Sequence, residues 1–346
     1  MATRFKPITQ NNDVATTRTL LHEAIPLTGT IVSGTYADGN IKNYSHGMFQ
    51  SVYDYPYLSS SANHVFDITV GYSSKSALSG ASNTQNAKKI NIYNQMAQVL
   101  AGHDATGSIR EFDRDGNLSD TDAKLREVFF LNFSRLLVKD EIKKESLILT
   151  FLTGGTPGDR RGGAEYKISD YGAATKYKTN SPAGEYGILY TSSATPNADS
   201  GVGLIYYQAG IAVLTGSIFD GAFGPPATGL DTASFNTLVT SSNISSSCDG
   251  VRNALKNLTF NNTTELNSTI YFCRANFNEF NYSSNPTYLS SSQLRVKTRE
   301  TDEPVSYITT VGLYSTDNAL MAIAKLSEPL KKTPATEFTL RVRLDY

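Results

Sequence analysis

The sequence contains no tryptophan, only two cysteines and four histidines among its 346 residues, and only 18% of its residues are charged. Two cysteines are too few for a scaffold held together by disulfides, so we expect Cys248 and Cys273 to be reduced thiols. The 31 basic and 32 acidic residues balance to a net charge of −1, which excludes a general electrostatic attraction to nucleic acid or acidic lipid. No apolar run reaches the roughly 18 residues of a membrane span, and we expect no signal peptide.

The patterns of common catalytic and metal sites are missing as well. No Gly-x-Ser-x-Gly segment occurs, and the histidines lack the spacing of metal ligands. The glycine-rich segment 154–163 (GGTPGDRRGG) lacks the Gly-Lys-Ser/Thr ending of a phosphate-binding loop. We therefore predict that the chain is not an enzyme, and we expect no catalytic residues and no cofactor. The four histidines are His22, His46, His64 and His103.

The chain is instead rich in residues that form strands and turns, including 20 tyrosines, 16 phenylalanines and 26 glycines. Three apolar runs lie near its C-terminal end, at 307–314, 319–326 and 338–344. The polar residues 315–318 between the first two runs predict a hairpin. In the third run apolar and polar residues alternate, which is typical of a half-buried strand.

We predict a mainly β (α+β) fold with β-sandwich-like or barrel-like sheets, a C-terminal β-meander and a small helical insertion of about two helices. The apolar spacing predicts one helix over 85–101, with Ser82 and Gln85 placed as a capping box. A second helix is predicted over 122–138, although residues 128–131 alone also fit a buried strand. A weaker helical pattern lies near 249–258. Further strands are predicted at 29–36, 65–72, 146–152, 187–191, 203–207, 211–215, 269–274 and 293–298.

Two regions are expected along the chain. Residues 1–153 form a mixed α/β region that begins with a polar N-terminal arm, and residues 154–346 form a β-rich region that begins with the glycine-rich loop. The arm, at 6–20, has no apolar periodicity, so we expect it to gain structure on the surface of a neighbour.

One acidic segment, 111–122 (EFDRDGNLSDTD), resembles a calcium-binding loop. Gly116 falls at the sixth position, where such loops turn sharply. Two features weaken this interpretation: a glutamate occupies the first position, and the shorter aspartate occupies the twelfth. The alternative is a solvated acidic turn around the Asp-Gly dipeptide. The candidate ligands are Glu111, Asp113, Asp115, Asn117, Ser119 and Asp122.

Aromatic and arginine side chains are the candidate interface residues. Five aromatic residues lie within 44–57, a polar segment without clear periodicity, so they either pack beneath a loop or form a subunit interface. Two neighbouring arginines in the glycine-rich segment are suited to pairing with the carboxylates of a partner. These residues are Tyr44, Phe49, Tyr53, Tyr55, Tyr57, Arg160 and Arg161.

Several motifs together carry a resemblance to a known group of proteins. The segment ITTVGLY, followed by a four-residue polar turn and LMAIAKLSEPL, resembles the C-terminal region of virion structural proteins of contractile-tailed, T-even-like or cyanobacterial myophages. The segments 44–72, 91–104, 129–144 and 185–219 add to this resemblance. Together they cover roughly half of the chain, and none of them is a catalytic motif.

The resemblance implies a structural subunit of a bacteriophage virion, in the tail or baseplate, that is assembled in the cytoplasm of the bacterial host. Its expected partners are copies of itself and other tail or baseplate proteins, with no nucleic acid and no membrane span. A fibre-attachment or host-recognition protein, and a neck or head decoration protein of the same virion, are the alternatives. A cellular binding module or enzyme is the third hypothesis.

Overall fold

The computed structural model describes residues 5–27, 40–118, 120–153, 164–191, 200–219, 239–283, 289–290, 293–294, 299 and 301–346. Strands take 47% and helices 17% of the structure, which confirms the predicted mainly β class. The predicted strand at 29–36 and the glycine-rich loop at 154–163 lie outside the described residues. In the described part of the chain, no helix has the length and hydrophobicity that crossing a membrane requires.

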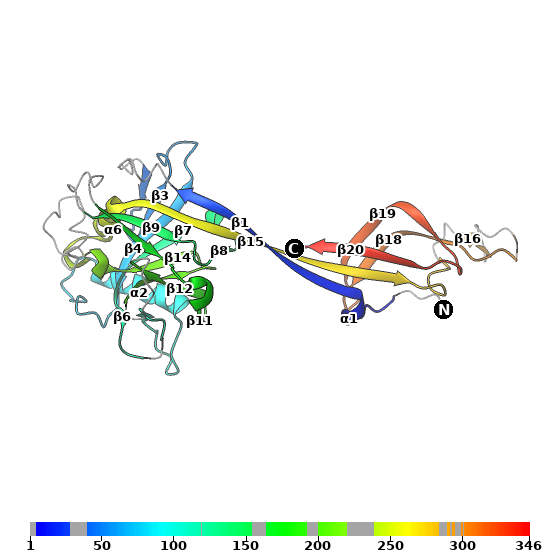
Figure 1. The fold of residues 1–346 in the computed structure, drawn as a ribbon, viewed down its shortest axis with the longest axis horizontal. Coiled ribbons are helices and arrows are strands. Elements are labelled where there is room, and N and C mark those ends of the chain that lie inside the picture. The colour runs from blue at the N-terminus through cyan, green and yellow to red at the C-terminus, as the bar shows by residue number, and fades with distance from the viewer. Residues whose placement is uncertain are drawn as a thin grey trace. The chain divides into compact units, whose positions relative to one another are not determined.

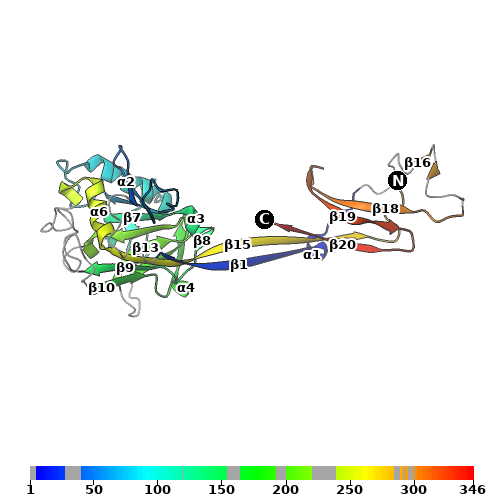
Figure 2. The ribbon, with the colours of Figure 1, turned by 90° about the horizontal axis from the view of Figure 1, so that it is seen from above.

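Most strands belong to one 14-stranded sheet, whose strands can be followed in Figure 1 and, from above, in Figure 2. Every strand pair with a defined register is antiparallel. The strand order is β1 (Val14–Leu27), β15 (Leu255–Ala275), β9 (Ile148–Thr153), β10 (Ala164–Ser169), β12 (Gly184–Tyr190), β13 (Gly201–Tyr206), β14 (Ile211–Thr215), β7 (Glu127–Phe133), β4 (His64–Tyr72), β3 (Gln50–Tyr53) and β2 (Ile41–Asn43). Off this path, β11 (Lys178–Ser181) pairs with β12, and β8 (Glu141–Ile142) and β20 (Phe338–Asp345) pair with β15.

The contacts within the chain divide it into two compact units. The larger unit spans 21–264, and the smaller unit combines 1–20 with 265–346. The division falls inside β1 and inside β15, so both strands contribute residues to both units. The sequence-based division into a mixed α/β region at 1–153 and a β-rich region at 154–346 stays a prediction.

The predicted helix over 122–138 is wrong. Residues 124–133 form the short strand β6 (Lys124–Leu125) and the central strand β7, and only Arg135–Val138 is helical, as α3. Residues 128–131 are all fully buried between β4 and β14. A strand buried on both faces is apolar at successive positions, so its sequence also satisfies a helical stripe. The alternative of a buried strand at 128–131 is confirmed.

The predicted helix over 85–101 is confirmed as α2 (Asn86–Leu100), which packs on β4. Gly71 of β4 allows this close approach, because a Cβ there would lie 2.8 Å from the carbonyl oxygen of Lys89. The predicted capping box does not form, since Gln85 is itself the N-cap residue and makes no side-chain cap. Its side-chain oxygen instead accepts a hydrogen bond from the amide of Ile244 at 2.9 Å.

The second long helix is α6 (Ile244–Ala254), which begins and ends earlier than the predicted range of 249–258. The Asn243 side chain caps its first turn by accepting a hydrogen bond from the amide of Ser246. Residues 255–258 belong to β15, because Leu255 and Leu258 are buried in the sheet core. Cys248 of α6 is buried and Cys273 of β15 is half-buried, and both thiols are free. The short helical turns are α1 (Gln10–Asp13), α4 (Ala173–Lys176) and η4 (Gly216–Phe219).

Lys89 and Asp170 are among the charged side chains that are buried in the larger unit, and both hold loops in place. Lys89 is fully buried on α2, and its ammonium donates to the carbonyl oxygens of Thr84, Val239 and Ser242. Burial lowers the pKa of Lys89 to about 8. Asp170 is 1% exposed. It accepts hydrogen bonds from the amides of Glu145 and Leu147 and from the hydroxyl of Tyr207.

In the smaller unit, the predicted C-terminal hairpin is confirmed. Strands β18 (Ser306–Tyr314) and β19 (Leu320–Lys332) pair antiparallel around the turn at 315–318. The third predicted strand is β20, and its side chains alternate between half-buried and exposed as expected. Its partner is β15, with Val342 opposite Tyr271, so β20 does not pair with β19 as a continuing meander would. The remaining two-stranded sheet pairs β16 (Leu289–Ser290) with β17 (Gln293–Leu294).

Candidate functional site

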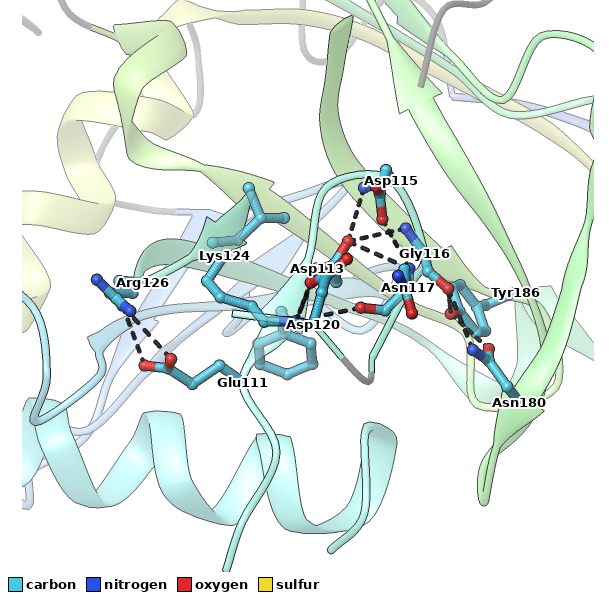
Figure 3. Close-up of polar contacts among 12 residues, drawn as sticks. Glu111, Asp113, Asp115, Gly116, Asn117, Asp120, Lys124, Arg126, Asn180 and Tyr186 are labelled. Atoms are coloured by element: carbon cyan, nitrogen blue, oxygen red, sulfur yellow. Dashed lines mark hydrogen bonds and ion pairs between the residues drawn. The ribbon is translucent and has the colours of Figure 1, made fainter. Parts of the chain in front are cut away.

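The acidic segment forms a hairpin loop in the larger unit, between β5 (Phe112–Asp113) and β6. Asp113 is buried, and one of its carboxylate oxygens accepts hydrogen bonds from the amides of Asp115, Gly116 and Asn117 at 2.8–3.3 Å (Figure 3). Gly116 has a φ of +80°, a conformation that glycine adopts without steric cost. The loop is therefore organised around the buried Asp113 carboxylate.

A lysine supplies the positive charge of this loop. The Nζ atom of Lys124 lies 2.6 Å from Asp113 Oδ2, 3.0 Å from Asp120 Oδ1 and 3.2 Å from the carbonyl oxygen of Asn117. Only 7% of the Lys124 side chain is exposed. Burial opposes the charge on Lys124, but the hydrogen bonds to Asp113 and Asp120 outweigh burial and raise the pKa of Lys124. The ammonium therefore stays protonated at neutral pH and offsets negative charge on the buried Asp113 and the half-buried Asp120.

The predicted calcium ligands do not all meet at this point. Carboxylate oxygens of Asp113, Asp115 and Asp120 lie within 4.8 Å of one another, and Asp120 was not among the predicted ligands. Glu111 points away from them, as Figure 3 shows, and accepts hydrogen bonds from Ser73 at 2.5 Å and from Arg126 at 3.3 Å.

Asp122 and Ser119 complete the predicted set. Asp122 is exposed, and Ser119 lies outside the described residues. The helix expected after the loop is replaced by strands β6 and β7, so the loop does not join two helices. The calcium hypothesis stays a prediction, and a bound cation would compete with the Lys124 ammonium for the same oxygens.

A groove of about 600 Å³ lies beside the loop. Its lining carries both signs of charge, with three basic and two acidic side chains as well as the hydroxyls of Ser200, Thr215 and Ser217. Arg126 and Lys124 are already paired with Glu111 and Asp113, so they contribute little net positive charge to the groove. The charged residues of the lining are Arg114, Asp122, Lys124, Arg126 and Glu127.

The five predicted aromatic interface residues separate into two groups around the hairpin of β2 and β3. In the first group, the Tyr44 ring lies 4.8 Å from Phe49 and stacks on His46 at 5.2 Å, and Lys42 Nζ lies 5.0 Å from the Tyr44 centroid. These rings are only partly exposed, so packing of the turn accounts for much of their area.

In the second group, the Tyr53 ring lies 6.2 Å from Tyr57 and 5.5 Å from His64. Tyr55 is 52% exposed and Leu58 is 85% exposed. This group therefore exposes apolar surface, and its role as a subunit interface stays a prediction. Arg160 and Arg161 lie outside the described residues.

An exposed apolar surface also lies on the β18–β19 hairpin of the smaller unit, away from the predicted interface residues. Leu320 is 51%, Met321 71% and Ile323 58% exposed, and the half-exposed rings of Phe5 and Tyr314 meet edge to face at 5.1 Å. A strand with one solvated face alternates apolar and polar residues. The run of successive apolar residues at 319–324 departs from this alternation, and it was the sequence signal for an apolar surface on both faces.

Comparison of the chain with protein-family models, with curated proteins and with solved structures gives no match in any of the three.

Proposed function

We propose that this chain is a non-enzymatic structural subunit of a contractile-tailed bacteriophage virion, located in the tail or baseplate, and that it acts through protein–protein assembly interfaces. The location follows from the sequence resemblance given above. The observation that carries the assembly role is the distribution of apolar side chains in the smaller unit.

The smaller unit buries few apolar side chains and exposes many. Of the 51 buried hydrophobic residues described, only Ala275, Leu313 and Val342 belong to it. Of the 21 large hydrophobic residues described as exposed, 12 belong to it. Contiguous exposed apolar surface is typical of protein–protein interfaces. A unit with this distribution gains stability when another chain covers it.

Free strand edges support the same role. The described side chains of β1 are almost all exposed, and β1 lies at the end of the strand order, where β15 is its only neighbour among the strands that the structure describes. The backbone groups on the other side of β1 are therefore available for pairing with a strand of a neighbouring subunit. Assembly by strand addition needs no catalytic group, which agrees with the expectation that the chain is not an enzyme.

A host-recognition or fibre-attachment role in the same virion is the second candidate. The exposed Tyr55, Tyr57 and Leu58 favour it, because exposed aromatic rings are suited to contacts with a receptor surface. A neck or head decoration protein would use the same kind of assembly surface at another position in the virion.

Labelling of intact virions tests the proposal. An antibody raised against the purified chain is applied to virions and viewed by negative-stain electron microscopy, with virions treated with preimmune serum as the control. Label confined to the tail tip is the expected result. Label on the head, neck or distal fibres would replace the baseplate assignment by the second candidate, and the absence of label from every virion would overturn the proposal.

A further inference from the structure

The β18–β19 hairpin has two different faces. On one face, the side chains of Val311, Leu313 and Ala322 are half-buried or buried within the smaller unit. On the other face, Gly312 pairs with Ile323 and Thr310 pairs with Lys325, and all four residues except the small Gly312 present exposed side chains. On this second face Phe5 packs edge to face on Tyr314, whereas Leu320, Met321 and Ile323 stay more than half exposed.

Two local features shape the exposed face. A Cβ on Gly312 would lie 2.9 Å from the Tyr314 ring and 3.4 Å from Leu320 Cδ1, so both side chains lie over the glycine. The register shifts between the pairs Leu313–Ala322 and Tyr314–Leu320, which makes Met321 the extra residue of a β-bulge. Bulges redirect side chains outward, and Met321 is the most exposed of the apolar residues on β19.

Two opposite charges flank this apolar face. Asp317 lies in the turn, four residues before Met321, and Lys325 lies on β19, four residues after it. Both are exposed, and neither forms an ion pair with any residue that the structure describes. A two-fold axis near Met321 would bring Asp317 of each copy opposite Lys325 of the other. The face is therefore complementary to itself in charge as well as in apolar character.

We infer that the exposed face of the β18–β19 hairpin binds a second copy of this chain through a two-fold contact centred on Met321, with reciprocal ion pairs between Asp317 and Lys325. The smaller unit buries few of its own apolar residues, so it needs a partner that is always present. Other copies of the chain meet this requirement, because they are made together with it. The inference rests on the proposed assembly role and names its partner.

Sedimentation velocity of the full chain over a wide concentration range tests this contact. The wild type is expected to form dimers. Asp317→Lys and Lys325→Asp place like charges opposite each other twice per dimer, so each should weaken dimerisation by about tenfold or more. The double variant Asp317→Lys/Lys325→Asp restores opposite charges and should return affinity to near the wild-type value. Lys75→Asp, the same charge change on an exposed lysine of the larger unit, is the matched control and should have no effect.

A second variant tests the apolar centre. Met321→Glu should abolish the dimer while leaving the urea midpoint of the larger unit unchanged, because Met321 is 71% exposed and belongs to the smaller unit. A chain that stays monomeric at every concentration, a dimer that is indifferent to Met321→Glu, or a double charge exchange that fails to restore affinity would each overturn the inference. Virion labelling remains independent of these outcomes, because the sedimentation experiment uses the isolated chain.

Discussion

The two units of the chain use their apolar side chains in opposite ways. The larger unit gathers them into a single cluster that runs from Ile41 to Phe260, and its central strand β7 is buried on both faces. The smaller unit distributes its apolar residues over half-buried and exposed positions, and none of its described residues belongs to that cluster. A large buried core allows a domain to fold alone, whereas two- and three-stranded sheets without one need additional packing. We therefore expect the larger unit to be stable as a monomer and the smaller unit to depend on association.

Removing a buried ring from the larger unit should have the largest effect. Phe129 is fully buried on β7, and its ring lies 5.4 Å from that of Phe219 in an edge-to-face contact. Phe129→Ala should lower the free energy of unfolding by about 3–5 kcal/mol, measured by urea denaturation. Ile323→Ala is the matched change in the smaller unit, and its cost to the isolated chain should stay within about 0.5 kcal/mol. Equal costs would contradict the difference between the units.

Removing the buried lysine of the acidic loop should have the next largest effect. Lys124→Met leaves the buried Asp113 carboxylate without its cation, which should cost about 3–5 kcal/mol in urea denaturation. Added calcium should recover part of this loss only in the variant, because Asp113, Asp115 and Asp120 then lack the competing ammonium. Arg343→Met, which removes an exposed ion pair with Asp345 in the smaller unit, should not measurably change stability.

The pH dependence of stability should have opposite signs in the two units. Burial raises the pKa of Asp170 to about 6, so its contribution to stability is fully present below its unfolded pKa of 3.8 and is lost as pH rises toward 6. Measured against Asp170→Asn, the wild type should therefore lose up to about 3 kcal/mol as pH rises from below the unfolded pKa to above the folded pKa, and about 2 kcal/mol of this between pH 4 and pH 6.

Asp345 of the smaller unit provides the contrast. Hydrogen bonds from Ser268 and Arg343 lower the pKa of Asp345. Its contribution is present above its unfolded pKa and is lost as pH falls through the folded value. Relative to Asp345→Asn, the wild type should therefore gain stability as pH rises through the acid range, and slopes of the same sign for the two variants would contradict this assignment.

A matched pair of glycines gives the smallest expected effects. The Cβ of Gly71→Ala would lie 2.8 Å from the Lys89 carbonyl oxygen and 2.9 Å from the Tyr93 nitrogen, both of which are backbone atoms of α2. This overpacking should cost about 1–3 kcal/mol. In Gly312→Ala the new methyl meets the end of the half-exposed Tyr314 ring, which can move aside, so the cost should stay within about 0.5 kcal/mol. Thermal unfolding of both variants measures the difference between the two stability costs. Equal costs would show that the Tyr314 ring cannot move aside, which would contradict this prediction.

Much of the secondary structure was predictable because local pattern decides it. Helix α2 carries a clear apolar stripe and ends at Leu100, two residues before Gly102, which has a φ of +79° and donates a hydrogen bond to the Ala97 carbonyl oxygen. The β18–β19 hairpin follows from its polar turn, and the strands that line the core follow from short apolar runs between turns. Strand β7 was mistaken for part of a helix because residues 128–131 are apolar at every position.

The arrangement of the candidate site was less predictable, because it depends on contacts between distant residues. The sequence motif placed Glu111 and Asp122 in the acidic site, whereas the fold turns Glu111 toward Arg126 and brings in Asp120 and Lys124. The pairing of β20 with β15 joins residues about 75 positions apart, for which the alternation of β20 carries no signal. The division into two units could not be predicted from the sequence either, because its boundaries fall inside the continuous strands β1 and β15.

Hydrogen exchange measured at several protein concentrations tests most directly whether the smaller unit depends on a second copy. The amides of β4 and β7 should exchange slowly and at the same rate at every concentration, since their protection comes from the core of the larger unit. The amides of β18 and β19 should exchange faster as the chain is diluted below its dimer dissociation constant. Slow exchange of β18 and β19 that does not change on dilution would contradict this account.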